Sequence, residues 1–173
     1  IDTLSEIASE FSDFAKMPQP KNEIIKLVDI IENTVDLYGG IDNISFEFNY
    51  DKNLNYNIFA DKKQILRVFN NLINNSVQAI DNEKNGAIKI SLFKADGFNV
   101  ITINDNGKGI PEEQKDKVFI PNFSTKTGGM GLGLAIVKSI IEGANGTINF
   151  ESDEAKGTTF IVKLPEIIKT NNI

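Results

Sequence analysis

The sequence predicts a two-layer α/β sandwich, in which helices cover one face of a mixed, mostly antiparallel β-sheet. Stretches with apolar residues every three or four positions, typical of amphipathic helices, occur among short stretches of strict apolar–polar alternation, typical of half-buried strands. Each alternating stretch places polar side chains on one side, so one face of the sheet is expected to meet water. Hydrophobic residues make up 40% of the 173 residues, which is enough apolar material for one folded domain.

Composition and charge exclude several classes of protein. The chain has no Cys and no His, which excludes disulfides, thiolate metal sites and a Ser-His-Asp triad. The net charge of −6 and the single arginine, Arg67, argue against a nucleic-acid surface. No apolar run approaches the ~18 residues that cross a bilayer, and no signal-peptide pattern is present. We therefore expect the sequence as given to be soluble.

The first expected element is an amphipathic helix over residues 1–17. Its apolar stripe, as on the seam of a coiled coil, consists of Ile1, Leu4, Ala8, Phe11 and Ala15. Pro18 and Pro20 break this helix because proline lacks an amide donor. We expect a linker at residues 18–22 and one domain over residues 23–168.

The domain is expected to contain its helices and strands in the following order. After an apolar stretch at 23–27, a helical pattern runs to about residue 38, followed by strands near 44–48 and 56–60 and a long helix at about 61–80. Hairpin strands at 87–94 and 98–105 precede a loop with a short helical piece near 111–118. An apolar helix near 132–141 and strands at 147–151 and 158–164 complete the chain.

The long helix carries an unusual polar face. Asn71, Asn75 and Gln78 fall within about 60° of one another, opposite the apolar side. Asparagine is a poor helix former because its side chain competes for backbone hydrogen bonds, so the four Asn within residues 70–75 should weaken the helix. The amide oxygens could bind a hard cation such as Mg²⁺ together with substrate phosphates. The alternative is a plain polar face in an Asn-rich protein.

Asp105 ends a strand on the same side as Ile101 and Ile103, so its carboxylate should point toward the core. A buried carboxylate must be paired or hydrogen-bonded. Gly107 and Gly109 follow and allow a tight turn or a close approach to a ligand. Asp105 could accept a hydrogen bond from an exocyclic amine such as that of adenine, or it could simply cap an ordinary turn.

Residues 128–134, Gly-Gly-Met-Gly-Leu-Gly-Leu, open the apolar helix. Glycines there weaken the helix, which suggests that backbone amides contact a ligand, and a helix N-terminus favours phosphate. Residues 124–127 add hydroxyls and the cation of Lys126, which also suit phosphate. The alternative is a mobile surface loop. The pattern is neither a P-loop nor a dinucleotide fingerprint.

In this order the segments resemble the ATP-binding catalytic domain of bacterial sensor histidine kinases, in the superfamily shared with gyrase, heat-shock chaperone and MutL ATPases. The matching motifs are the N box (Asn71–Ser76), the G1 box (Asp105–Ile110), the F box (Phe119–Phe123), the G2 box (Gly129–Leu134) and a last glycine motif (Gly157–Phe160). Residues 9–18 are similar to the end of the dimerisation and phosphoacceptor hairpin of nitrogen-regulation-type sensor kinases. The implied fold is the histidine-kinase/gyrase-type ATPase sandwich.

The resemblance implies ATP and Mg²⁺ as ligands. Asn75 would hold Mg²⁺ and act in catalysis with Lys126, while Asp105 would accept from the adenine amino group with Thr158 behind it. The other implied nucleotide-binding residues are Asn71, Gln78, Gly107, Gly109, Ile110, Phe123, Thr125, Gly129, Met130, Gly131, Leu132, Gly133 and Leu134. Phe119 and Phe123 would anchor the lid. Gln78 stands where many relatives have Lys or Arg, so Lys126 or Lys108 would have to neutralise phosphate charge.

The family's reaction transfers the ATP γ-phosphoryl group to a histidine, and from there to an aspartate of a response regulator. The accepting histidine would lie on an upstream dimerisation helix that this chain lacks, so the chain should bind ATP without autophosphorylating. The resemblance implies a homodimeric full-length protein and a cytoplasmic domain, and relatives are often anchored in the inner membrane. Two alternatives stay open: a nucleotide-binding regulatory module without transfer, and a serine kinase of the anti-sigma type.

Overall fold

A computed structural model describes residues 19–81, 85–121 and 131–167 of the chain. In chain order its elements are β1 (Asn22–Lys26), α2 (Leu27–Tyr38), β2 (Ile44–Tyr50), β3 (Asn57–Asp61), α3 (Lys62–Ala79), β4 (Gly86–Ala95), β5 (Phe98–Asp105), α4 (Glu112–Lys115), α5 (Gly133–Gly143), β6 (Thr147–Asp153) and β7 (Gly157–Pro165). The helix expected over residues 1–17 lies outside the described residues.

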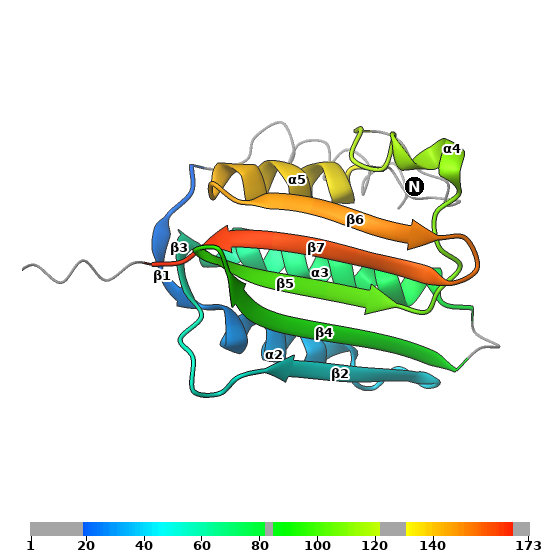
Figure 1. Ribbon diagram of the computed structural model, residues 1–173, viewed down its shortest axis with the longest axis horizontal. Coiled ribbons are helices and arrows are strands. Elements are labelled where there is room, and N and C mark those ends of the chain that lie inside the picture. Colours follow the sequence, from blue (N-terminus) through cyan, green and yellow to red (C-terminus); the bar gives the residue numbers. More distant parts are fainter. Residues whose placement is uncertain (1–18, 82–84, 122–130, 168–173) are drawn as a thin grey trace, which may run out of the picture.

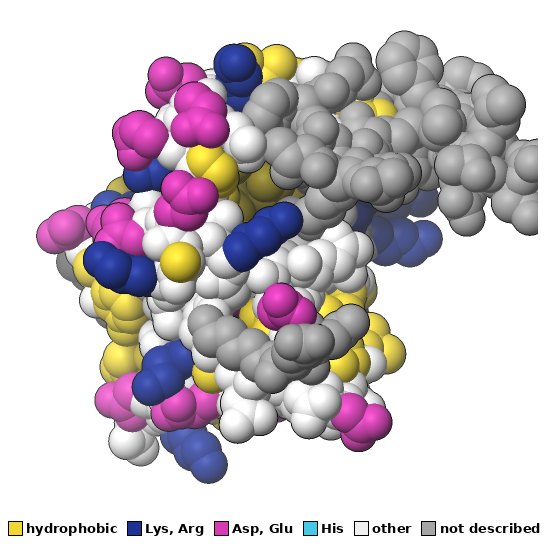
Figure 2. Space-filling view, turned by 90° about the vertical axis from the view of Figure 1, so that its right-hand side faces the viewer, with side chains coloured by type: hydrophobic (Ala, Val, Ile, Leu, Met, Phe, Trp, Pro, Cys, Tyr) yellow, Lys and Arg dark blue, Asp and Glu magenta, His cyan; other side chains and the backbone are white. Residues whose placement is uncertain are grey.

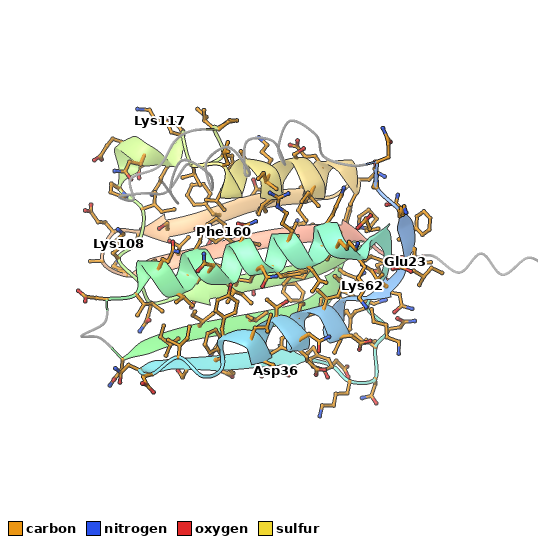
Figure 3. All side chains as sticks on the ribbon, turned by 180° about the vertical axis from the view of Figure 1, so that it is seen from behind. Glu23, Asp36, Lys62, Lys108, Lys117 and Phe160 are labelled. Carbon is orange, nitrogen blue, oxygen red and sulfur yellow. The ribbon has the colours of Figure 1, made fainter. Side chains whose placement is uncertain are left out.

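A five-stranded mixed sheet forms one layer of the molecule, with the strand order β2-β4-β5-β7-β6. β2 pairs with β4 in parallel, and the other neighbours are antiparallel. The helices α2, α3 and α5 cover one face of this sheet (Figure 1; Figure 3, from behind). The opposite face carries polar side chains, including the ion pair of Lys89 with Glu47 at 3.1 Å. The predicted two-layer sandwich, with one face toward water, is confirmed.

Helix α3 lies at the centre of the helical layer and packs against both α2 and α5. Its buried side chains, which include Phe69, Leu72 and Ile73, face the buried residues Ile90 and Ile101 of the sheet in one hydrophobic core. Burying one such side chain stabilises the fold by roughly 1.5–3 kcal/mol. The core therefore fixes the orientation of α3, and with it the direction of its polar face.

The N-terminus of α3 is capped by Asp61. Its Oδ1 accepts hydrogen bonds from the amides of Lys63 (2.9 Å) and Gln64 (3.1 Å), and its Oδ2 accepts one from the amide of Lys21 (2.7 Å). The first amides of a helix have no partner within the helix, so these bonds define where α3 starts. They lower the pKa of the Asp61 carboxyl, the bond from Lys21 contributing most.

Strand β1 is the main feature that the sequence does not predict. The apolar stretch at 23–27 shows no clear period, yet residues Asn22–Lys26 pair antiparallel with β3 in a separate two-stranded sheet. The strand begins at the last residue of the expected linker. Ile25 is buried and its neighbour Ile24 is exposed, which is the alternation of a strand. Because the paired residues lie 31 to 39 positions apart in the sequence, local periodicity contains no indication of the pairing.

Candidate functional site

The predicted motifs meet at one end of the molecule. The C-terminal end of α3, the segment after β5 and the turn between β6 and β7 lie at the right-hand end of Figure 1, and α5 starts at its end nearer to them. In Figure 3, Lys108 marks this end, whereas Lys62 and Glu23 lie at the opposite end of the molecule. Acidic and basic side chains are interspersed on the described surface at the motif end (Figure 2).

Asn71 brings the polar face of α3 to the start of α5. Its Nδ2 donates to the carbonyl of Arg67 at 3.0 Å, and its Oδ1 lies 3.0 Å from where a Cβ on Gly133 would be. At the N-cap position of α5, Leu132 is buried and provides no side-chain hydrogen bond. The helix start is thus a place where backbone N–H groups can meet an anion, beside an amide oxygen.

Asp105 is buried, with 2% of its surface exposed, as the strand alternation predicts. Its Oδ1 accepts hydrogen bonds from the amides of Gly107 (2.9 Å) and Thr158 (3.2 Å). Thr158 is also buried, at 4% exposed. Two backbone donors on one oxygen fix the orientation of the carboxylate, and they satisfy part of its demand for partners.

The segment after β5 is held against the end of α3. The amide of Lys108 donates to the carbonyl of Ala79 at 2.9 Å. This bond joins the G1 box to the C-terminal end of the helix that carries Asn71 and Asn75. The side chain of Lys108 is exposed.

Asn75 is half-buried on the same helix as Asn71, and Gln78 is exposed with its Nε2 donating to Asn74 Oδ1 at 3.4 Å. The next residue after Asn75, Ser76, is fully buried on α3. Its Oγ has no hydrogen-bond partner among the residues that the structure describes. Ser76 lies among the core-facing residues of α3 rather than on the polar face of Asn71 and Asn75, so its hydroxyl is not part of the candidate site.

The lid residues Phe123, Thr125, Lys126, Gly129 and Met130 lie outside the described residues. Their predicted roles stay predictions. Gly131 has a φ of 66°, the left-handed conformation that favours glycine, and Leu134 is half-buried beside the core.

Phe119, at the start of the F box, is described. Its ring lies 5.8 Å from that of Phe150 on β6, and Lys138 Nζ of α5 lies 5.7 Å from its centroid. These contacts attach the segment after α4 to both layers of the sandwich.

The sequence interpretation did not include Arg67, which lines a groove together with Asn71. An open groove of about 430 Å³ runs beside Asn71 along α3. It is lined by Tyr38, Lys63, Leu66, Arg67, Asn70, Asn71 and Asn74. Arg67 precedes Asn71 by one helical turn, and this i−4 spacing could have identified it as a neighbour on the same face.

Residues 60–168 match the family model described as the Histidine kinase-, DNA gyrase B-, and HSP90-like ATPase. The chain therefore belongs to this ATPase family. It is 34% identical to Sporulation kinase B of Bacillus subtilis over 95% of the chain, and 34% identical to Sensor histidine kinase ZraS of Escherichia coli over 95% of the chain. The chain spans 39% and 35% of the lengths of these two relatives.

Solved structures of histidine kinases share the fold. The catalytic domain of histidine kinase ThkA superposes with a TM-score of 0.74 at 34% identity, covering 84% of this chain and 95% of that one. ThkA in complex with the response regulator protein TrrA superposes with a TM-score of 0.77 at 29% identity, covering 95% of this chain and 47% of that one. The predicted fold and family are confirmed. Across the described residues, none of the helices is both long and apolar enough to cross a membrane.

Proposed function

We propose that this chain is the ATP-binding catalytic part of a sensor histidine kinase, which donates the γ-phosphoryl group of ATP to a histidine on an upstream dimerisation helix. The observation that carries the proposal is the convergence of three features at one end of the fold. These are the core-directed carboxylate of Asp105, the amide-bearing face of α3 at Asn71 and Asn75, and the glycine-rich start of α5. The names of the relatives support the same function.

The base end of the proposed site is formed by Asp105 and Thr158. A carboxylate that already accepts two backbone amides on Oδ1 is held in one orientation. It can accept the hydrogen bonds of an exocyclic amino group, which adenine has and guanine lacks at the corresponding position. This assigns base selectivity to Asp105.

The phosphate end is formed by α3 and the start of α5. Asn71 and Asn75 offer amide oxygens, and Gly131, Leu132 and Gly133 offer backbone amides to the triphosphate. Arg67 lies one turn from Asn71 in the groove and adds positive charge there. Arg67 thus joins Lys108 and Lys126 as a source of the charge that Gln78 does not provide.

The described residues fit Mg²⁺ held together with the nucleotide. Among them, no three His, Cys, Asp or Glu side chains gather as a metal cluster. Magnesium usually takes one or two protein oxygens, several waters and substrate phosphates, and the half-buried Asn75 on the phosphate side suits that role. When bound, the ion offsets the negative charge of the phosphate oxygens. Asn75 would hold it, and Asn71 would lie beside the phosphates.

Phosphoryl transfer depends mainly on positioning and charge stabilisation. The bond between the γ-phosphorus and the β–γ bridging oxygen breaks, ADP leaves, and a bond forms between phosphorus and an imidazole nitrogen of the acceptor. This chain contains no His, so its residues bind the donor and the acceptor must come from elsewhere. A response regulator aspartate is the expected next acceptor, and the similarity to ThkA, which was solved in complex with the response regulator protein TrrA, supports this step.

The same proposal assigns the remaining parts of the chain. Residues 1–17 would be the C-terminal end of the dimerisation helix, residues 18–22 the linker, and residues 23–168 the catalytic domain. The full-length protein would be a homodimer, with this domain in the cytoplasm and an anchor in the inner membrane.

The test compares this chain with a version extended upstream to include the phosphoacceptor hairpin. Titration with a fluorescent ATP analogue should show Mg²⁺-dependent binding by this chain, and incubation with γ-labelled ATP should leave it without acid-labile phosphate. The extended protein should gain acid-labile phosphate, and Asn75→Ala should abolish that gain. Binding without any transfer by the extended protein would indicate a regulatory module instead. Acid-stable phosphate on serine would indicate a serine kinase.

A further inference from the structure

The turn between β6 and β7 is fastened to the segment after β5, which carries the G1 box. The amide of Ala155 donates to the carbonyl of Lys108 at 2.7 Å. The amide of Ile110 donates to the side-chain oxygen of Ser152 at 2.9 Å. One hairpin therefore holds two successive parts of the same loop.

The backbones approach so closely that two positions need glycine. Gly109 has a φ of +72°, and a Cβ there would lie 2.1 Å from the carbonyl oxygen of Asp153. Gly157 has a φ of +112°, and a Cβ there would lie 1.9 Å from the carbonyl oxygen of Asp105. Both contacts join the hairpin to the loop. Neither the hairpin nor the loop can therefore shift without moving the other.

Ser152 lies at the centre of this contact. Its Oγ accepts from Ile110, lies 3.0 Å from the carbonyl oxygen of Gly157 and lies 2.9 Å from Thr158 Oγ1. A serine hydroxyl has one hydrogen to donate. Ser152 donates it either to Gly157, in which case Thr158 donates to Ser152, or directly to Thr158. In both arrangements the Thr158 hydroxyl is bonded to Ser152 and its rotation is restricted.

Thr158 links this network to the carboxylate of Asp105, because its amide donates to Asp105 Oδ1. Across the sheet, Ser152 on β6 is paired with Thr158 on β7, and Thr158 is paired with Asp105 on β5. One strand therefore separates Ser152 from Asp105. Ser152 acts on the base end through Thr158 and Ile110.

We propose that Ser152 is a positioning residue that sets the base selectivity of the nucleotide site, by fixing the Thr158 hydroxyl and the Ile110 backbone. This inference rests on the proposed function. With Ser152 present, the Thr158 hydroxyl stays bonded to Ser152 Oγ, at 2.9 Å, so its rotation next to Asp105 is restricted. Without it, the hydroxyl can rotate to donate or to accept, so the site tolerates a keto group where adenine has an amino group.

The experiment measures the dissociation constants of ADP and GDP for the whole chain by calorimetry. Ser152→Ala should weaken ADP binding about fivefold, the scale of one hydrogen bond, and should lower the ratio of ADP to GDP affinity by at least that factor. Ser152→Thr, which keeps the hydroxyl, should restore the ratio. The matched control is Ser45→Ala. It removes a hydroxyl on β2, at the opposite edge of the sheet from Ser152, that donates to the Gly86 carbonyl at 3.1 Å. It should change neither constant.

A double variant separates positioning from simple loss of stability. In a Thr158→Val background, Ser152→Ala should lower selectivity less than in the unsubstituted chain, because the hydroxyl is gone and only the bond from Ile110 remains to be lost. Equal loss for ADP and GDP, or full additivity of the two substitutions, would overturn the inference. If Ser152→Ala does not fold, Thr158→Val alone tests the inference. A Thr158→Val variant with the same ratio of ADP to GDP affinity as the unsubstituted chain would overturn it. Failure of the unsubstituted chain to bind ADP would instead contradict the proposed function.

Discussion

Two aspartates at opposite ends of the fold show how the surroundings decide what a carboxylate does. Asp61 and Asp105 both accept backbone amides. Asp61 caps the start of α3, where its Oδ1 accepts from the helix's own amides. Asp105 is buried at the other end of the molecule, where its partners come from its own loop and from the distant strand β7. The first arrangement stabilises a helix, and the second fixes a binding group.

The role proposed for Asp105 predicts a base-specific defect. In Asp105→Asn, one oxygen can still accept from Gly107 and Thr158, but the other position carries an N–H₂ group that opposes an amino group of the ligand. ADP binding should weaken by about 10- to 100-fold, the scale of a hydrogen bond to a charged group, and GDP binding should weaken less. Calorimetry with both nucleotides measures this, with circular dichroism to check folding. An equal loss for the two nucleotides would contradict the assignment.

The role of Asp61 predicts a defect in stability that depends on pH. Hydrogen bonds lower its folded pKa below the ordinary value of 3.8. The charged cap therefore stabilises the fold above the unfolded pKa, and this contribution disappears as pH falls through the folded pKa. Asp61→Ala should lose about 0.5–2 kcal/mol of unfolding free energy at pH 7, and the difference from the unsubstituted chain should shrink below about pH 4.

Urea denaturation at pH 7 and at about pH 3 would measure this difference. Asp61→Asn is the matched control, because asparagine caps helices about as well as aspartate but carries no charge. A gap between Asp61→Ala and the unsubstituted chain that stays constant with pH would show that the charge of the cap does not matter.

At the scale of elements, the β6–β7 hairpin and the loop after β5 are a single unit because their backbones touch. Gly157 is the tightest point of that contact. Gly97, in the turn between β4 and β5, also has a positive φ, of +81° against +112° at Gly157, but a Cβ there would meet no atom within 4 Å. Comparing the two glycines therefore tests what crowding at Gly157 adds to the cost of a positive φ.

Gly97→Ala should cost about 1 kcal/mol of unfolding free energy, the cost of a left-handed alanine. Gly157→Ala should cost about 2 kcal/mol or more, because the Asp105 carbonyl must also move. Only Gly157→Ala should weaken nucleotide binding. Thermal denaturation and ADP titration of the two variants measure both effects. Similar costs, or equal loss of binding, would contradict the coupling between hairpin and loop.

At the scale of the whole molecule, the candidate site and the core share α3. One side of this helix is buried in the core, and the other carries Asn71 and Asn75. A ligand that holds the polar side must therefore stabilise the whole fold against unfolding.

Mg²⁺-ADP at about 100 times its dissociation constant should add about 2.7 kcal/mol of stability, which raises the Tm of a domain of this size by about 5–10 °C. Scanning calorimetry measures the shift. Asp105→Asn at the same ADP concentration should show a smaller shift. A shift of the same size in both proteins would show that the ligand binds elsewhere.

The sequence alone determined the fold class, the positions of α3, α5 and the strands of the main sheet, and the inward direction of Asp105. These features follow from local periodicity, because apolar residues that recur with the period of a helix or strand must face the core. The resemblance to histidine kinases also came from ordered motifs along the chain. Only the tertiary structure decided that β1 pairs with β3 and that Ser152 joins Ile110 to Thr158. Both depend on contacts between segments far apart in the sequence, and the residues next to each segment give no indication of its partner.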